Sequence, residues 1–187
     1  MNLNLSRLIF IDAGHGGEDL GHTFDGVKEK EVCLNIAMLV GALLQTRGYS
    51  VLYSRNEDIN ATIQDRIIYA NNTDADCYVS VHCNYNKYTD HFHGCETLYR
   101  KNDLRSASLA KSIQTKVVSA AGAKNLLVRG TDNNDELNAA KLPAVVVNVG
   151  YLSHEVERQL MNSSIYQQAL ASSICEGIDR YFNGDYI

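Results

Sequence analysis

The chain has no tryptophan, a single proline and no hydrophobic run of the ~20 residues that a membrane span requires. Its five cysteines include no C-x-x-C pair, and their odd number fits poorly with a disulfide framework. The net charge of -5 argues against a nucleic-acid partner, which would call for a basic patch. The first seven residues lack the basic and apolar segments of a signal peptide, so synthesis in the cytoplasm is expected unless a targeting segment was trimmed.

The remaining composition is typical of a globular protein. Apolar residues make up 45% of the 187 residues and charged residues 21%, and no linker or repeat interrupts them. This length is sufficient to bury a core without disulfide or metal staples. We therefore expect one domain that spans residues 1–187, acting as a monomer.

Strand-like and helix-like segments alternate along the chain, which predicts an α/β fold with a mostly parallel sheet flanked by helices. Parallel sheets bind ligands beyond the carboxyl ends of their strands, where His15, His82 and Asn148 are expected. The predicted strands are 7–12, 50–54, 77–82, 95–99, 126–129 and 144–149. The predicted helices are Glu31–Arg47, Ile63–Ala70, Leu104–Ala120 and Ile165–Phe182, and a further helix is expected to begin at Glu155.

Three segments carry residue types that bind metals. His15 follows an apolar strand within a glycine-rich turn, Glu29 precedes a predicted helix, and His82 ends a second apolar strand. Two imidazoles and one carboxylate are the ligands of a catalytic zinc site, in which a fourth position stays open. Each residue also has a plain alternative: a turn histidine, a member of a solvated charge run, and a core histidine with a hydrogen-bond partner.

These segments together resemble the zinc-dependent N-acetylmuramoyl-L-alanine amidase family, the type-3 amidases of cell-wall hydrolases and phage endolysins. The resemblance implies a six-stranded α/β fold and a zinc ion held by His15, Glu29 and His82. It implies hydrolysis of the amide bond between the lactyl group of N-acetylmuramic acid and L-alanine, and thus action on the peptidoglycan of the bacterial cell wall. The matching segments are Asp12–Gly17, Glu29–Leu34, Ser80–Asn84, Gly94–Tyr99 and Leu142–Ser153.

The sequence departs from this family at one position. The family carries a glutamate that acts as general base or acid where this chain has Asn148. An amide cannot take a proton from water at any useful pH, so we expect metal binding with greatly reduced hydrolysis. Asn148 is then an engineered change, a natural loss that leaves a pseudoenzyme, or a position whose role another carboxylate has taken. Glu96 is the best substitute in the sequence, and Glu155 is a weaker one.

The substrate residues are less defined by the sequence. Two polar segments, 85–94 and 129–137, are expected to form loops beside the site, and the plain alternative for both is an ordinary solvated loop. Asn84 and Arg129 are the expected substrate contacts. Two other functions stay open: a non-catalytic peptidoglycan-binding module, and a zinc peptidase with the same ligand types.

Overall fold

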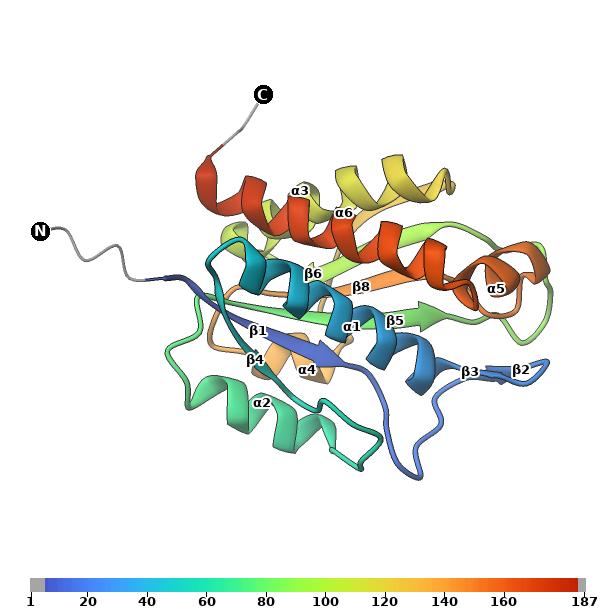
Figure 1. Cartoon of the computed structure of the whole chain (residues 1–187), viewed down its shortest axis with the longest axis horizontal. Coiled ribbons are helices and arrows are strands. Elements are labelled where there is room, and N and C mark those ends of the chain that lie inside the picture. Colours follow the sequence, from blue (N-terminus) through green and yellow to red (C-terminus); the bar gives the residue numbers. More distant parts are fainter. Residues whose placement is uncertain (1–5, 185–187) are drawn as a thin grey trace, which may run out of the picture.

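The structure is a computed structural model that describes residues 6–184. Residues 1–5, on which the expectation about a signal peptide largely depends, lie outside the described part. Its centre is a six-stranded sheet with the order β4-β1-β5-β8-β6-β7, accompanied by a small β2-β3 hairpin (Figure 1). The strands of the sheet are β1 (Leu8–Ala13), β4 (Ser50–Tyr53), β5 (Cys77–Asn84), β6 (Cys95–Arg100), β7 (Asn125–Thr131) and β8 (Ala144–Tyr151).

The sheet is parallel except at one junction. β6 pairs antiparallel with β8 and parallel with β7, whereas the other pairs are parallel. The amino-terminal end of β6 therefore lies at the same edge as the carboxyl ends of β5 and β8. The predicted fold, a mostly parallel six-stranded sheet flanked by helices, is confirmed.

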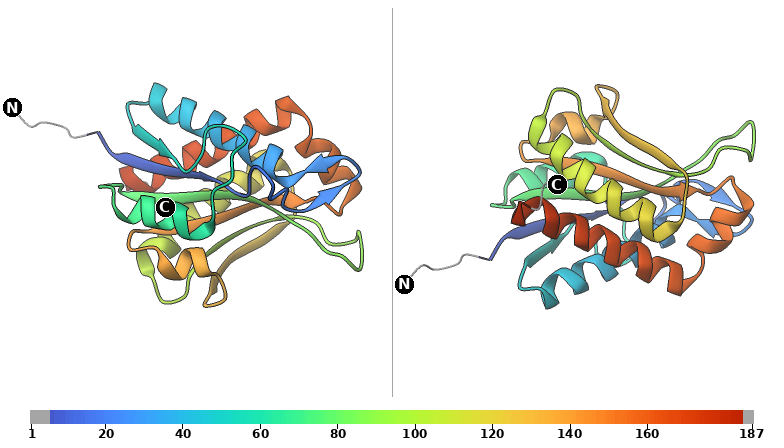
Figure 2. Two further views of the ribbon diagram at one scale, coloured as in Figure 1. Left: turned by 90° about the horizontal axis from the view of Figure 1, so that it is seen from below. Right: turned by 90° about the horizontal axis from the view of Figure 1, so that it is seen from above.

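Helices cover both faces of the sheet. Figure 2 shows α1, α3 and α6 on one face and α2 and α4 on the other. The helices are α1 (Glu29–Thr46), α2 (Ile63–Asn71), α3 (Leu104–Ala121), α4 (Asp135–Ala139), α5 (Glu155–Met161) and α6 (Ser164–Asn183). Throughout the described residues, every helix is too short or too polar to span a bilayer.

Two hydrophobic clusters pack against the two faces because side chains alternate along each strand. Ile9 and Ile11 of β1 belong to the cluster beneath α1, α3 and α6, whereas Phe10 belongs to the cluster beneath α2 and α4. By the same alternation Asp12 of β1 and His82 of β5 belong to the α2/α4 face. On this face of the sheet, the side chains thus change from apolar to polar at the edge where the strands end.

Each predicted strand and helix is present near its predicted place, and the described part of the chain contains three elements that were not predicted. Helix α1 begins two residues before its predicted start, at Glu29, and α5 begins at Glu155 as expected. The β2 (Thr23–Phe24) and β3 (Val27–Lys28) hairpin and helix α4 were not predicted. The prediction of a loop over 129–137 is wrong: β7 extends to Thr131 and α4 begins at Asp135, because Asn134 caps a short helix through Leu137 N.

Candidate metal centre

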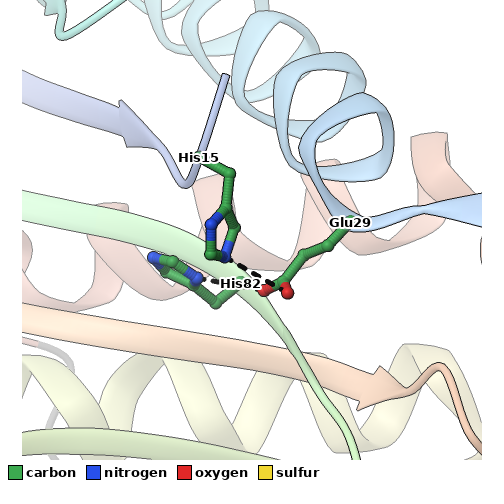
Figure 3. Close-up of side chains that lie close together, drawn as sticks. All are labelled: His15, Glu29 and His82. Atoms are coloured by element: carbon green, nitrogen blue, oxygen red, sulfur yellow. Dashed lines mark hydrogen bonds and ion pairs between the residues drawn. The ribbon is translucent and has the colours of Figure 1, made fainter. Parts of the chain in front are cut away.

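The structure brings His15, Glu29 and His82 together, and one ligand atom from each lies within 4.8 Å of the others. The Nε2 atom of His15 is 3.2 Å from Glu29 Oε2, and the Nδ1 atom of His82 is 3.0 Å from Glu29 Oε1. Figure 3 shows both rings directed at the carboxylate. Two ring nitrogens and a carboxylate oxygen at this spacing can hold one divalent cation, with a further position open.

Glu29 is the first residue of α1 and is 1% exposed. Its Oε1 accepts a hydrogen bond from the backbone N–H of Cys83 at 2.9 Å, and its Oε2 accepts one from the N–H of His22 at 2.9 Å. Its place at a helix N-terminus also favours its negative charge. This side chain is therefore fixed in the structure, and the alternative of a solvated member of a charge run is excluded.

Close packing holds the loop that follows β1. A Cβ atom on Gly14 would lie 2.3 Å from Cε1 of the His82 ring, so only glycine allows this approach. His15 adopts a left-handed backbone with φ 62°, a conformation that persists only when its surroundings enforce it. Two buried guanidinium groups do so, since Arg55 donates to the carbonyl oxygens of Ala13 and Gly14 and Arg66 donates to that of His15.

Asp19 orients the His15 ring. Its Oδ2 atom lies 2.8 Å from His15 Nδ1. When Nδ1 donates its proton to this carboxylate, Nε2 keeps a free lone pair that faces Glu29, which is the tautomer a metal ligand needs. Sequence reasoning missed Asp19, although its place four residues after a motif histidine is a usable signal.

The charges of the cluster stabilise one another in the absence of a cation. Burial alone would raise the pKa of Glu29, but hydrogen bonds to both imidazoles outweigh it and hold that pKa below its ordinary value. Burial likewise opposes the charge of His82, yet the Glu29 carboxylate, together with the charges of Glu136 and Asp12, raises the pKa of His82 to about 9. The same carboxylate raises the pKa of His15.

The stability of the metal-free protein should therefore depend on pH through His82. A raised histidine pKa contributes stability that is complete below the unfolded value of 6.5 and lost as the pH rises through about 9. Because the side chain is partly solvated, we expect a loss of about 2 kcal/mol from this group. Urea unfolding of chelator-treated protein at pH 6 and pH 9.5 measures it. The difference in unfolding free energy between the two pH values should be smaller in His82→Gln. It should be unchanged in His91→Gln, which alters an exposed histidine. An equal difference in all three proteins would contradict this account.

Asn148 lies beside the cluster and is 6% exposed. It is opposite His82 on β5 and opposite Glu96 on β6 in the register of the sheet. Its Nδ2 atom donates to Glu96 Oε1 at 3.3 Å. The expected substrate contacts surround the same carboxylate: Asn84 Nδ2 donates to Oε1 at 3.0 Å, and Arg129 Nε lies 3.4 Å from Oε2. Asn84, Glu96, Arg129 and Asn148 thus form one polar network at the edge where β5 and β8 end.

Glu155 does not join this network. It begins α5, four residues beyond the end of β8 at Tyr151, and is exposed to solvent. Glu96, by contrast, is the carboxylate next to Asn148. Of the two substitutes that the sequence offers for the family's glutamate, only Glu96 therefore lies in contact with position 148.

A cavity of about 580 Å³ opens beside the ligand cluster on the α2/α4 face. His15, His82, Asp12 and Glu136 line it. Burial raises the pKa of Asp12, but the charge of Arg66 and hydrogen bonds from Ser54, Ser80 and Arg66 together hold it below its ordinary value. Sequence reasoning did not single out Glu136, which lies in the 129–137 segment that was expected to form a loop beside the site.

The 85–94 segment is irregular, as predicted, and contributes aromatic surface near the site. Tyr85 stacks on His22 with ring centroids 4.7 Å apart, and Phe92 stacks on Tyr151 at 6.3 Å. Tyr88 is exposed. These rings are available to a ligand that lies across the edge of the sheet.

Comparison with known proteins agrees with this geometry. A sequence profile of the family Amidase_3, N-acetylmuramoyl-L-alanine amidase, matches residues 9–180. The uncharacterised protein YqiI of Bacillus subtilis is 30% identical over 181 residues, which are 95% of this chain and 85% of YqiI. The amidase LytC of B. subtilis is 31% identical over 180 residues, which are 95% of this chain and 36% of LytC.

The fold is likewise shared with a solved structure. The N-acetylmuramoyl-L-alanine amidase of Clostridium difficile 630 superposes with a TM-score of 0.92 at 31% identity, and the match covers 97% of this chain and 99% of that one. The sequence resemblance is thereby confirmed. This chain belongs to the N-acetylmuramoyl-L-alanine amidase family.

Proposed function

We propose that this chain is a zinc-dependent amidase domain that cleaves the bond between the lactyl group of N-acetylmuramic acid and L-alanine in peptidoglycan, and that Asn148 limits its rate. The observation that carries the proposal is the convergence of His15, Glu29 and His82 in a chain of this family. The donor set supports zinc, because imidazole nitrogen and carboxylate oxygen are ligands of catalytic zinc sites.

The residues around the cluster divide the work in this proposal. A bound zinc ion would polarise the scissile carbonyl and activate water for attack. His15, Glu29 and His82 would hold it, and Asp19 would keep His15 in the ligating tautomer. Asn148 donates a hydrogen bond to Glu96 and cannot accept a proton, so the proton transfer that a glutamate would perform at this position is lost.

The substrate is proposed to be peptidoglycan, and the place of action the bacterial cell wall. The cavity is lined by His15 and His82, and Tyr85 of the 85–94 segment stacks on His22, whose backbone N–H donates to Glu29. Such a surface suits an extended glycan with peptide stems better than a deep pocket would. All of these groups come from one chain, so we propose that it acts as a monomer and that residues 1–187 form one catalytic domain.

Asn148 favours one alternative function. A family member without its general base could bind peptidoglycan without cleaving it, since the candidate ligands of the cation, His15, Glu29 and His82, do not include residue 148. In that case the chain is a wall-binding pseudoenzyme.

A zinc peptidase, which would use the same ligand types, would cut within the peptide stem instead.

Product analysis tests the proposal. Zinc-loaded protein is incubated with purified peptidoglycan, with chelator-treated protein as the control, and the products are identified by mass spectrometry. We expect slow, zinc-dependent release of peptides that begin with L-alanine. New termini within the stem would indicate a peptidase, and binding without cleavage, even in Asn148→Glu, would indicate the pseudoenzyme.

A further inference from the structure

Glu136 is a buried carboxyl group with no part in the proposed chemistry so far. It is the second residue of α4 and is 4% exposed. The hydroxyl group of Tyr78 donates a hydrogen bond to its Oε1 atom. Burying a carboxyl group beside other acids is unfavourable, and burial together with the charge of Asp12 raises the pKa of Glu136 to about 7. Burying an apolar side chain here would cost less free energy, so packing alone does not explain the carboxyl group.

The position of Glu136 relative to His82 supplies one. A carboxylate oxygen of Glu136, one of Asp12 and a ring nitrogen of His82 all lie within 4.8 Å of one another. Glu136 and His82 also line the same cavity. A single water molecule can bridge two polar groups at this separation.

The His82 ring has one nitrogen free for such a contact. Its Nδ1 faces Glu29, and Figure 3 shows its other nitrogen directed away from that carboxylate. Within residues 6–184, Nε2 of His82 has no protein hydrogen-bond partner, and it is not fully buried. It is therefore accessible from the cavity that His82 lines.

His15, the other histidine of the cluster, contacts carboxylates through both of its ring nitrogens. One nitrogen of His15 contacts the carboxylate of Asp19, and the other faces Glu29. Histidine ligands of metals commonly bind an outer carboxylate through their second nitrogen, which fixes the tautomer and the orientation of the ring. Two carboxylates, Asp12 and Glu136, likewise lie near the ring of His82. Asp12 already forms an ion pair with Arg66, which leaves Glu136 as the carboxylate available to His82.

We propose that Glu136 is a positioning residue for His82: through a bridging water it accepts a hydrogen bond from the Nε2–H group, which keeps the proton on Nε2 and leaves Nδ1 unprotonated toward the cation site. This inference rests on the proposed function, because it assigns to Glu136 an effect on metal affinity. Tyr78 is the residue that holds the Glu136 carboxylate in place.

The test is the zinc affinity of Glu136→Gln, measured by competition with a chromogenic chelator, together with the absorption spectrum of the cobalt-substituted protein. We expect zinc affinity to fall by roughly 10- to 100-fold, the usual effect of removing such an outer carboxylate. The cobalt spectrum should shift because the His82 ring is reoriented. The unfolding midpoint of the metal-free variant should not fall, since a buried charge has been removed.

Two further variants make the result specific. Glu157→Gln removes another buried carboxylate, which accepts backbone N–H groups of Gly94 and Tyr151, and it should leave zinc affinity unchanged. Tyr78→Phe keeps the Glu136 carboxylate but removes its hydrogen-bond donor, and it should weaken zinc binding by less than Glu136→Gln does. If Glu136→Gln does not fold, Tyr78→Phe decides: unchanged affinity and an unchanged cobalt spectrum would overturn the proposal.

The possible failures can be told apart. Unchanged zinc affinity in folded Glu136→Gln, with a lowered unfolding midpoint, would assign Glu136 a structural role with Tyr78 and overturn this inference alone. A wild-type chain that binds no zinc would overturn both this inference and the proposed function.

Discussion

Asn148→Glu is expected to raise kcat for peptidoglycan hydrolysis by roughly 100- to 10,000-fold, the typical contribution of general acid–base catalysis. The new carboxylate would lie beside Glu96, whose Oε1 atom is 3.3 Å from Asn148 Nδ2 in the present chain. The charge of Glu96 would raise the pKa of the new group toward neutrality, which suits a general base. Steady-state release of L-alanyl peptides from purified peptidoglycan measures the gain.

Asn148→Gln is the matched control for this gain. Its side chain has the length of glutamate but cannot take a proton, so kcat should stay at the level of the unmodified chain. Glu96→Gln addresses the remaining alternative, in which Glu96 already acts as the base. If Glu96→Gln abolishes activity and Asn148→Glu gives no gain, the proposed role of residue 148 is wrong.

Glu29→Gln is expected to remove metal binding. Glu29 supplies the carboxylate that both imidazoles face, and its two oxygens accept backbone N–H groups that an amide can satisfy only in part. Since loss of an outer carboxylate alone lowers metal affinity by about 10- to 100-fold, loss of this ligand should lower zinc affinity by more than about 100-fold. Isothermal titration with zinc measures the change, and peptidoglycan hydrolysis should fall with it.

Glu31→Gln is the control for that experiment. Glu31 lies in the same turn of α1 but is largely exposed, and it pairs with Lys28 at 2.9 Å on the surface. Its substitution should change neither zinc affinity nor hydrolysis. Equal losses in Glu29→Gln and Glu31→Gln would mean that the first turn of the helix, and not the Glu29 carboxylate, determines binding.

The main strands and helices could be predicted from the sequence because each carries a long hydrophobic pattern. The buried run of β8 and the heptad-like apolar spacing of α1 are examples. The β2-β3 hairpin and α4 could not, since strands of two residues and a helix of five are too short for a periodic signal. The antiparallel direction of β6 was also hidden, because a strand's own sequence does not reveal the direction of its neighbours.

Some residues of the candidate site could likewise be predicted from the sequence, and others could not. His15, Glu29 and His82 were proposed from residue types at strand and helix ends, where the topology of a parallel sheet brings distant segments together. Asp19 and Glu136 depend on three-dimensional placement. Glu136 follows Asn133, Asn134 and Asp135 in a polar run that is typical of a solvated loop, and only the packing of α4 against Tyr78 buries it. The contact between Glu96 and Asn148 likewise requires the register of β6 on β8.

The zinc content of the unmodified chain tests the central claim most directly. Protein that has been treated with chelator, titrated with zinc and freed of excess metal should retain one ion per chain by elemental analysis, and the His82→Gln variant should retain far less. Retention of no zinc by the unmodified chain, or equal retention by both proteins, would contradict the assignment of His15, Glu29 and His82 as a metal centre.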